Sequence, residues 1–74
     1  MPETDPRTEL PEPHERMRIR MRAGVTLQQI ADTLGVSAVT AWNWENGKDG
    51  PGRENAIRYG ELLKRLDEAV RQAS

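Results

Sequence analysis

The amino-acid sequence predicts an all-α fold, a compact domain of four helices, or five if the last helix breaks. Three observations lead to this prediction. Residues that start helices occur at several points of the chain, apolar residues then recur at helical spacing, and glycine-containing turns follow. The expected domain covers residues 13–74 and contains a long C-terminal helix.

The N-terminal segment, residues 1–12, differs in composition from the rest of the chain. Met1 and Leu10 are its only apolar residues, and four of the five prolines lie between Met1 and Pro13. Such a segment buries too little apolar surface to offset the entropy lost on ordering. We therefore expect a flexible acidic tail, either a charged arm that discourages loose contacts or docks onto a partner, or a tail without a function.

A first helix is expected from Pro13 to about Ala23, because proline suits the first turn of a helix and Gly24 suits its end. Arginines at every second position from Arg16 to Arg22 superficially resemble a strand. The segment instead leads through Gly24-Val25 directly into a capped helix, which favours the helical interpretation. Most of these arginines are expected to be solvated.

Residues 26–47 carry the clearest local signals in the chain. Thr26 and Gln29 have the spacing of a capping box, and an apolar stripe follows at helical spacing. Gly35 suits a helix end at positive φ, and Ser37 can cap a second helix immediately afterwards. Two short helices joined by this tight turn form a helix-turn-helix, although an ordinary helical hairpin uses the same turn chemistry.

The same stretch resembles the Cro/C1-type, phage repressor-like (XRE) helix-turn-helix family. The resemblance rests on Ala31, Gly35, Val36, Ser37 and the sequence Trp-Glu-Asn-Gly at 44–47. It implies a lambda-repressor-like domain that binds double-stranded operator DNA, with the second helix of the motif in the major groove. It also implies a partly buried ion pair between Arg20 and Glu45.

The two tryptophans define which side of the second motif helix faces outward. Trp42 and Trp44 lie two residues apart, so they point in directions about 200° apart around a helix. Ala41 and Trp44 continue the inward line from Val36, which leaves Trp42 exposed.

The family pattern, carried over to this chain, implies two groups of DNA contacts. Asn43 suits recognition of adenine, and small apolar side chains suit thymine methyl groups. The expected base contacts are Ala38, Val39, Trp42 and Asn43. The expected phosphate contacts are Thr26, Gln28, Ser37, Thr40, Asn46, Lys48 and Arg53.

The chain departs from the family pattern at two points, and both affect the DNA contacts expected from the family. Leu27 stands where the family usually has a phosphate-contacting Gln, so Gln28 would have to substitute for it. There is also no Arg or Lys between Ser37 and Gly47. An exposed Trp42 would suit a protein groove as well as DNA, so a protein partner for this face is the alternative.

A last helix is expected from about Arg53 to about Gln72, with Gly60 permitting a close approach or a small break. This helix is longer than a small domain needs to cover its core. Its second half therefore keeps an apolar side that the core does not use. Leu66, Val70 and Ala73 on that side are expected to form a homodimer contact; otherwise this part folds back onto its own domain or frays.

Charge and composition exclude several classes of function. Residues 1–15 hold five acidic residues against Arg7, whereas residues 16–74 hold ten Lys/Arg against seven Asp/Glu, so only the predicted domain is mildly basic. There is no cysteine and no apolar run that would span a membrane, and we expect a cytoplasmic protein of a bacterial or phage-infected cell, associated with the nucleoid. His14 has no Cys or Ser nucleophile near it, so we expect neither an enzyme nor a metal or other cofactor.

Together these features predict a sequence-specific repressor or regulator of transcription that binds a palindromic operator as a homodimer. Two alternatives remain at this stage. The chain would be a directionality or architectural factor in recombination, or an antitoxin or anti-repressor module that binds a protein.

Overall fold

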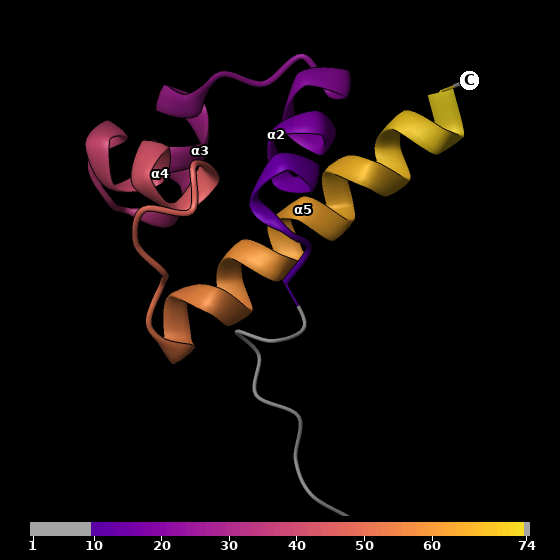
Figure 1. Cartoon of the computed structure of the whole chain (residues 1–74). Helices are drawn as coiled ribbons and strands as arrows, with labels where there is room; N and C mark the ends of the chain where they lie inside the picture. The colour runs from indigo at the N-terminus through magenta and orange to yellow at the C-terminus, as the bar shows by residue number, and fades with distance from the viewer. Residues whose placement is uncertain (1–9, 74) are drawn as a thin grey trace, which may run out of the picture.

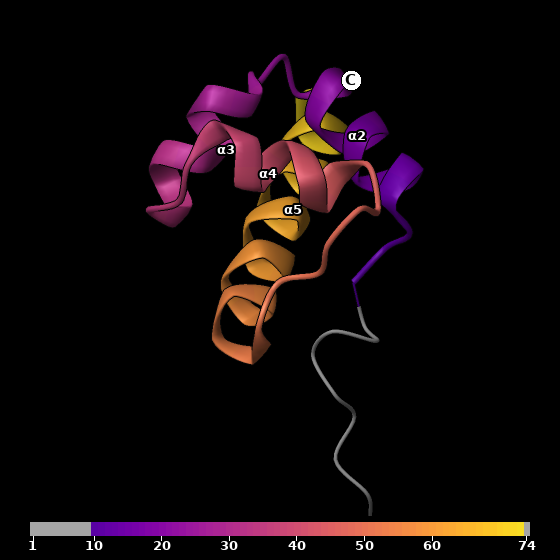
Figure 2. The same cartoon turned by 60° about the vertical axis from the view of Figure 1, so that its left-hand side comes forward.

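The computed structural model describes residues 10–73 and confirms the all-α prediction for this part of the chain (Figure 1). It contains four helices, α2 (Pro13–Arg22), α3 (Leu27–Leu34), α4 (Ala38–Glu45) and α5 (Arg53–Ala73). In Figure 1, α5 runs diagonally as one long helix and the three shorter helices lie on one side of it; Figure 2 shows α5 nearly upright.

Helix α3 begins and ends, and helix α4 begins, at the residues whose chemistry predicted them. The Thr26 side chain accepts a hydrogen bond from Gln29 N–H, and the Gln29 side chain accepts one from Thr26 N–H, which completes the capping box. Gly35 ends α3 in the left-handed conformation, with φ of 70°. Ser37 then caps α4 by accepting a hydrogen bond from Thr40 N–H. This geometry confirms the helix-turn-helix.

The core lies where α3, α4 and α5 meet. Ile30, Ala31 and Leu34 of α3 pack against residues of α4 and α5, and the buried cluster also contains Ala41, Trp44, Tyr59 and Leu63. The rings of Trp44 and Tyr59 lie 5.7 Å apart between centroids at an angle of 35°. Ala31 is fully buried, which agrees with its predicted position at the crossing of the two motif helices.

Helix α5 continues without a break through Gly60, so the fold has four described helices rather than five. A Cβ atom at position 60 would lie 3.5 Å from Leu10 Cδ2, which is an ordinary van der Waals contact. Alanine would therefore fit at position 60, and the approach of Leu10 does not require glycine.

Packing of the domain begins earlier than the expected boundary at Pro13. Leu10 is half-buried against the core, and the Pro11 carbonyl accepts a hydrogen bond of 2.7 Å from Arg16 Nε. Leu10, Pro11 and Glu12, which were expected to belong to a flexible tail, thus form part of the domain surface. The rest of that expected tail, residues 1–9, lies outside the described residues, as does Ser74.

Candidate nucleic-acid interface

Helix α4 presents an outer face formed by Val39, Trp42 and Asn43. Val39 is 69% exposed and Trp42 is 45% exposed, whereas Trp44 on the opposite side is only 3% exposed. The prediction that Trp44 points inward and Trp42 outward is therefore confirmed. Asn43, half-buried, lies next to them in the helical order.

Ala38 was expected on this outer face, and the structure corrects its position. Its side chain is half-buried and packs against the core cluster. Ala38 is the first residue of α4, where the helix still lies close to α3 after the short turn at Gly35. Most of the outward apolar surface of α4 therefore comes from Val39 and Trp42.

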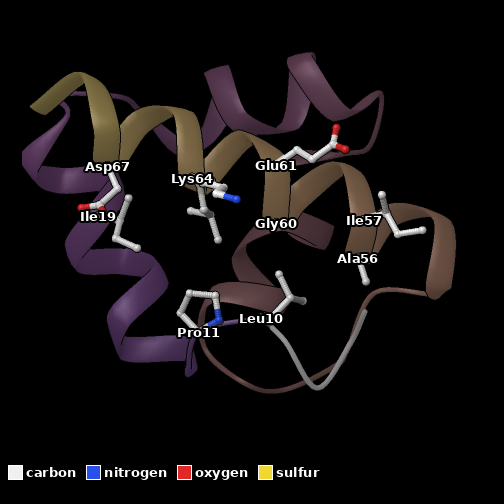
Figure 3. Close-up of a pocket in the computed structure, with 10 residues that line it drawn as sticks. Leu10, Pro11, Ile19, Ala56, Ile57, Gly60, Glu61, Lys64 and Asp67 are labelled. Carbon is white, nitrogen blue, oxygen red and sulfur yellow. The ribbon is translucent and has the colours of Figure 1, made fainter. Parts of the chain in front are cut away.

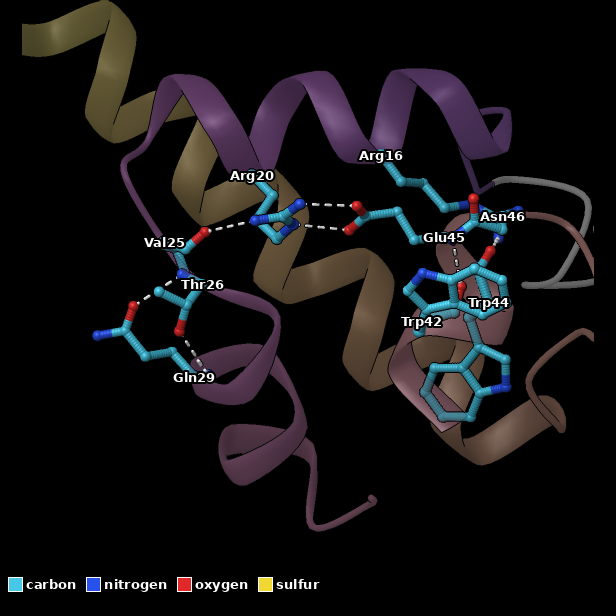
Figure 4. A network of polar contacts seen from close by, with 9 residues as sticks. All are labelled: Arg16, Arg20, Val25, Thr26, Gln29, Trp42, Trp44, Glu45 and Asn46. Atoms are coloured by element: carbon cyan, nitrogen blue, oxygen red, sulfur yellow. Dashed lines mark hydrogen bonds and ion pairs between the residues drawn. The ribbon is translucent and has the colours of Figure 1, made fainter. Parts of the chain in front are cut away.

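An ion pair fixes the C-terminal end of α4 to α2 (Figure 4). Arg20 donates from Nε to Glu45 Oε2 at 2.7 Å and from a terminal nitrogen to Oε1 at 2.8 Å, so the contact is bidentate. Arg20 also donates to the Val25 carbonyl at 2.9 Å, which holds the turn between α2 and α3. Glu45 is only 4% exposed, and its hydrogen bonds raise the pKa of Arg20.

Two further arginines bind backbone carbonyls inside the domain, and the sequence did not reveal either contact. Arg16 donates to the Trp44 carbonyl at 2.9 Å, and its guanidinium lies 5.8 Å from the centre of the Tyr59 ring. Arg58 donates to the Leu34 and Thr33 carbonyls at the C-terminal end of α3. The position of Arg16 one turn before Arg20 was the only available signal for its contact, and Arg58 offered none.

The two N-caps place hydroxyl groups at the amino ends of α3 and α4. Thr26 and Ser37 each accept a backbone hydrogen bond through oxygen, and Ser37 Oγ lies 2.9 Å from Thr40 Oγ1. One of the Ser37 and Thr40 hydroxyls donates to the other in this contact, so the pair keeps one hydroxyl hydrogen for a partner. Both helix ends also present partial positive charge, which favours an anion such as phosphate.

Two of the amides expected to contact phosphate have partners within the protein. Gln28 Nε2 donates to Asp32 Oδ1 at 2.8 Å, and Asn46 Nδ2 donates to the Trp42 carbonyl at 2.8 Å. The second contact caps the C-terminal end of α4. Each amide keeps a second N–H, so a phosphate contact would add to these bonds rather than replace them.

The charge on this side of the domain is small and lies at its rim. Glu45 is the only charged residue of α4, and it is neutralised by Arg20. The exposed cations Lys48 and Arg53 follow in the next loop and at the start of α5. Because Arg16, Arg20 and Arg58 bind groups of the protein itself, the basic excess of the domain overstates the charge available to a partner.

Comparison with known proteins decides the family. A family model described as a helix-turn-helix domain matches residues 17–73, from within α2 to the end of α5. The chain belongs to this helix-turn-helix family. The family consists of XRE/Cro-like domains, so the match indicates DNA binding in a regulatory role, and such domains are typically not enzymes. Searches of curated proteins and of solved structures returned no match.

Residues 10–73 of this helix-turn-helix domain contain neither a membrane-spanning helix nor a cluster of metal-binding side chains. No helix there is long and apolar enough to cross a membrane. No group of three or more His, Asp or Glu side chains in the same part of the chain is arranged to hold a metal ion.

Proposed function

We propose that this domain binds duplex DNA sequence-specifically with α4 in the major groove, and that it acts as a transcriptional repressor or regulator of the Cro/C1 type. The observation that carries the proposal is the outer face of α4, which is exposed while the opposite side of the helix is fixed by the core and by the Arg20–Glu45 pair. A helix held in this way can present side chains to base edges without reorganising.

The base contacts of this proposal come from the N-terminal half and middle of α4. Asn43 would bind adenine through its amide, with Val39 and Trp42 beside it on the outer face. Ala38 contributes only the exposed part of its methyl group, because it also packs against the core. Promoter occupation by the bound domain would then exclude RNA polymerase.

The phosphate contacts of the proposal surround this face. Thr26, Ser37 and Thr40 supply hydroxyls near the helix N-termini, and Gln28 and Asn46 supply their remaining amide hydrogens. Lys48 and Arg53, which follow the C-terminal end of α4 in the next loop and at the start of α5, supply positive charge. Contacts of this kind position the domain on DNA without reading the sequence.

We further propose that the domain binds as a homodimer through the C-terminal half of α5. Leu66 and Val70 are half-buried and Ala73 is exposed, and together with Arg22, the last residue of α2, and its C-cap Ala23 they line a shallow groove. A second copy would cover this apolar strip and place two α4 helices on half-sites about one helical turn apart.

Sedimentation equilibrium of the full chain tests the dimer. Val70→Glu places a charge in the proposed contact and should leave a monomer that is still helical. Glu68→Lys changes charge on the opposite side of α5 and should leave the association unchanged. A wild-type chain that stays monomeric at high micromolar concentration and on DNA would refute the homodimer.

A protein partner for the outer face of α4 is the second candidate function, and the exposure of Trp42 and Val39 favours it. Such a module would serve as an antitoxin or anti-repressor. Within the DNA-binding class, a directionality factor for recombination would use the same contacts at a different DNA site.

Selection from a random duplex library, followed by footprinting on the DNA around the gene, separates these functions. Protection of a palindrome at the chain's own promoter supports repression. Protection beside an attachment site supports the recombination role. Failure to shift any duplex at low salt would refute both DNA-binding functions and leave the protein-binding one.

A further inference from the structure

The outer face of α4 is apolar where a DNA-binding helix must meet base edges. Val39 and Trp42 are two of the four large apolar side chains that are strongly exposed among residues 10–73. Between Ala38 and Asn46 the only charged side chain is Glu45, which is buried and paired with Arg20. This face therefore offers base edges hydrocarbon surface and the amide of Asn43.

Few groups in the major groove match such a surface. Most atoms there are hydrogen-bond donors or acceptors, and covering them with Val39 would remove their water without replacing its hydrogen bonds. The C5-methyl group of thymine is the apolar exception among the four bases. Contact between this methyl group and Val39 or Trp42 buries hydrocarbon on both sides.

The position of Asn43 favours the same base pair. Asn43 lies one turn after Val39 and next to Trp42, so these three side chains share one side of α4. An asparagine amide can bind adenine N6 and N7 bidentately, and the partner base of adenine carries the C5-methyl group. An A·T pair thus offers both chemistries that this face contains.

We propose that Val39 and Trp42 read thymine C5-methyl groups, and that operator binding by this protein depends on those methyl groups in place of contacts from Arg or Lys. The inference rests on the proposed DNA-binding function and names its ligand chemistry. Val39 and Trp42 are specificity-determining residues in this scheme, and Asn43 selects the adenine of the same or a neighbouring pair.

The test removes the methyl group and nothing else. A duplex is first selected with the full chain from a random library that contains thymine. The selected duplex is then synthesised with uracil replacing single thymines, and its dissociation constant is measured by fluorescence anisotropy. Burial of one methyl group corresponds to about a fourfold change in affinity. We expect uracil to lower the affinity about fourfold when it replaces a contacted thymine. Replacement of a thymine outside the half-sites should leave the affinity unchanged.

Two variants assign the effect to α4. Val39 is 69% exposed, so Val39→Ser should fold normally, bind the thymine duplex more weakly, and lose its preference over uracil at one position of each half-site. Trp42→Ala should lose the preference at a neighbouring position. Thermal unfolding followed by circular dichroism verifies that both variants are folded.

The outcomes separate this inference from the function on which it rests. Recovery of a duplex whose binding is equal with thymine and uracil overturns the methyl readout while leaving DNA binding intact. Unchanged uracil sensitivity in both variants also overturns it, because the methyl groups would then be read elsewhere. If no duplex is recovered at low salt, the proposed function itself is refuted.

Discussion

The Arg20–Glu45 ion pair should be among the largest single contributions to the stability of this small domain. Arg20→Ala would leave a carboxylate that is 4% exposed without its bidentate partner and would remove the donor to the Val25 carbonyl. Loss of one partner from a buried pair typically costs about 3–5 kcal/mol. A chain of 74 residues has a total stability of roughly 4–11 kcal/mol. The variant should therefore lose a large fraction of the total stability, and it is close to unfolded at 25 °C if the wild-type stability lies at the low end of this range.

Urea unfolding followed by circular dichroism measures this effect, with an osmolyte in all samples so that the variant remains partly folded. Arg18→Ala is the matched control, because Arg18 lies on the same helix and makes only an exposed contact of 3.4 Å with Glu15. Its cost should stay below about 0.5 kcal/mol.

The double variant Arg20→Leu/Glu45→Leu removes both charges and should recover much of the stability lost by Arg20→Ala. The reasoning is refuted if Arg20→Ala costs less than about 1 kcal/mol. It is also refuted if the double variant is no more stable than Arg20→Ala, since the unpaired carboxylate would then not be the cause.

Three further predictions concern the turn, the core and the charge. Gly35→Ala should lower the free energy of unfolding, measured in urea, by about 1–2 kcal/mol because φ is 70° at this position. Gly52→Ala is the control and should lower it much less, because Gly52 has open space around it and no positive φ. Burial raises the pKa of Tyr59 to about 12, so the free energy of unfolding should fall between pH 10 and pH 12, where tyrosine ionises only in the unfolded chain; Tyr59→Phe should lack this decrease. Lys48→Gln should make the slope of log affinity against log salt shallower by about 0.9 per bound protomer, with unchanged sequence preference; an unchanged slope would show that Lys48 does not contact phosphate.

Local sequence signals predicted the helix-turn-helix well, because capping and left-handed turns are decided within a few residues. Thr26, Gln29, Gly35 and Ser37 all occupy the roles that their chemistry indicated. The opposite exposure of the two tryptophans followed from helix geometry alone. The Arg20–Glu45 contact, in contrast, was expected only from the family resemblance, since 25 residues separate the partners.

The contacts that the sequence did not predict are long-range or depend on exact crossing distances. Arg16 reaches a carbonyl 28 residues away, and no local pattern marks a backbone acceptor. Leu10 packs against the core, but it belongs to a proline-rich, acidic segment. The composition of that segment does not show that one of its residues contacts the helices. Ala38 is half-buried because α4 begins close to α3, and helical periodicity alone does not give that separation.

The groove beside Leu10 shows how this N-terminal contact extends the domain surface (Figure 3). Leu10 and Pro11 line it from one side, and Ile57, Gly60 and Lys64 of α5 line it from the other. The exposed Ile57, 42% accessible, lines this groove and does not belong to the buried core cluster.

Tryptophan fluorescence during titration with the selected duplex is the most direct test of how this domain meets DNA. Trp42 is 45% exposed and Trp44 only 3%, so the outer face of α4 carries its own reporter. We expect quenching by acrylamide to decrease as the duplex saturates the protein, and we expect Trp42→Phe to abolish this change while the buried Trp44 continues to emit. Saturation of binding with Trp42 still fully accessible to acrylamide would contradict placement of this face of α4 against the DNA.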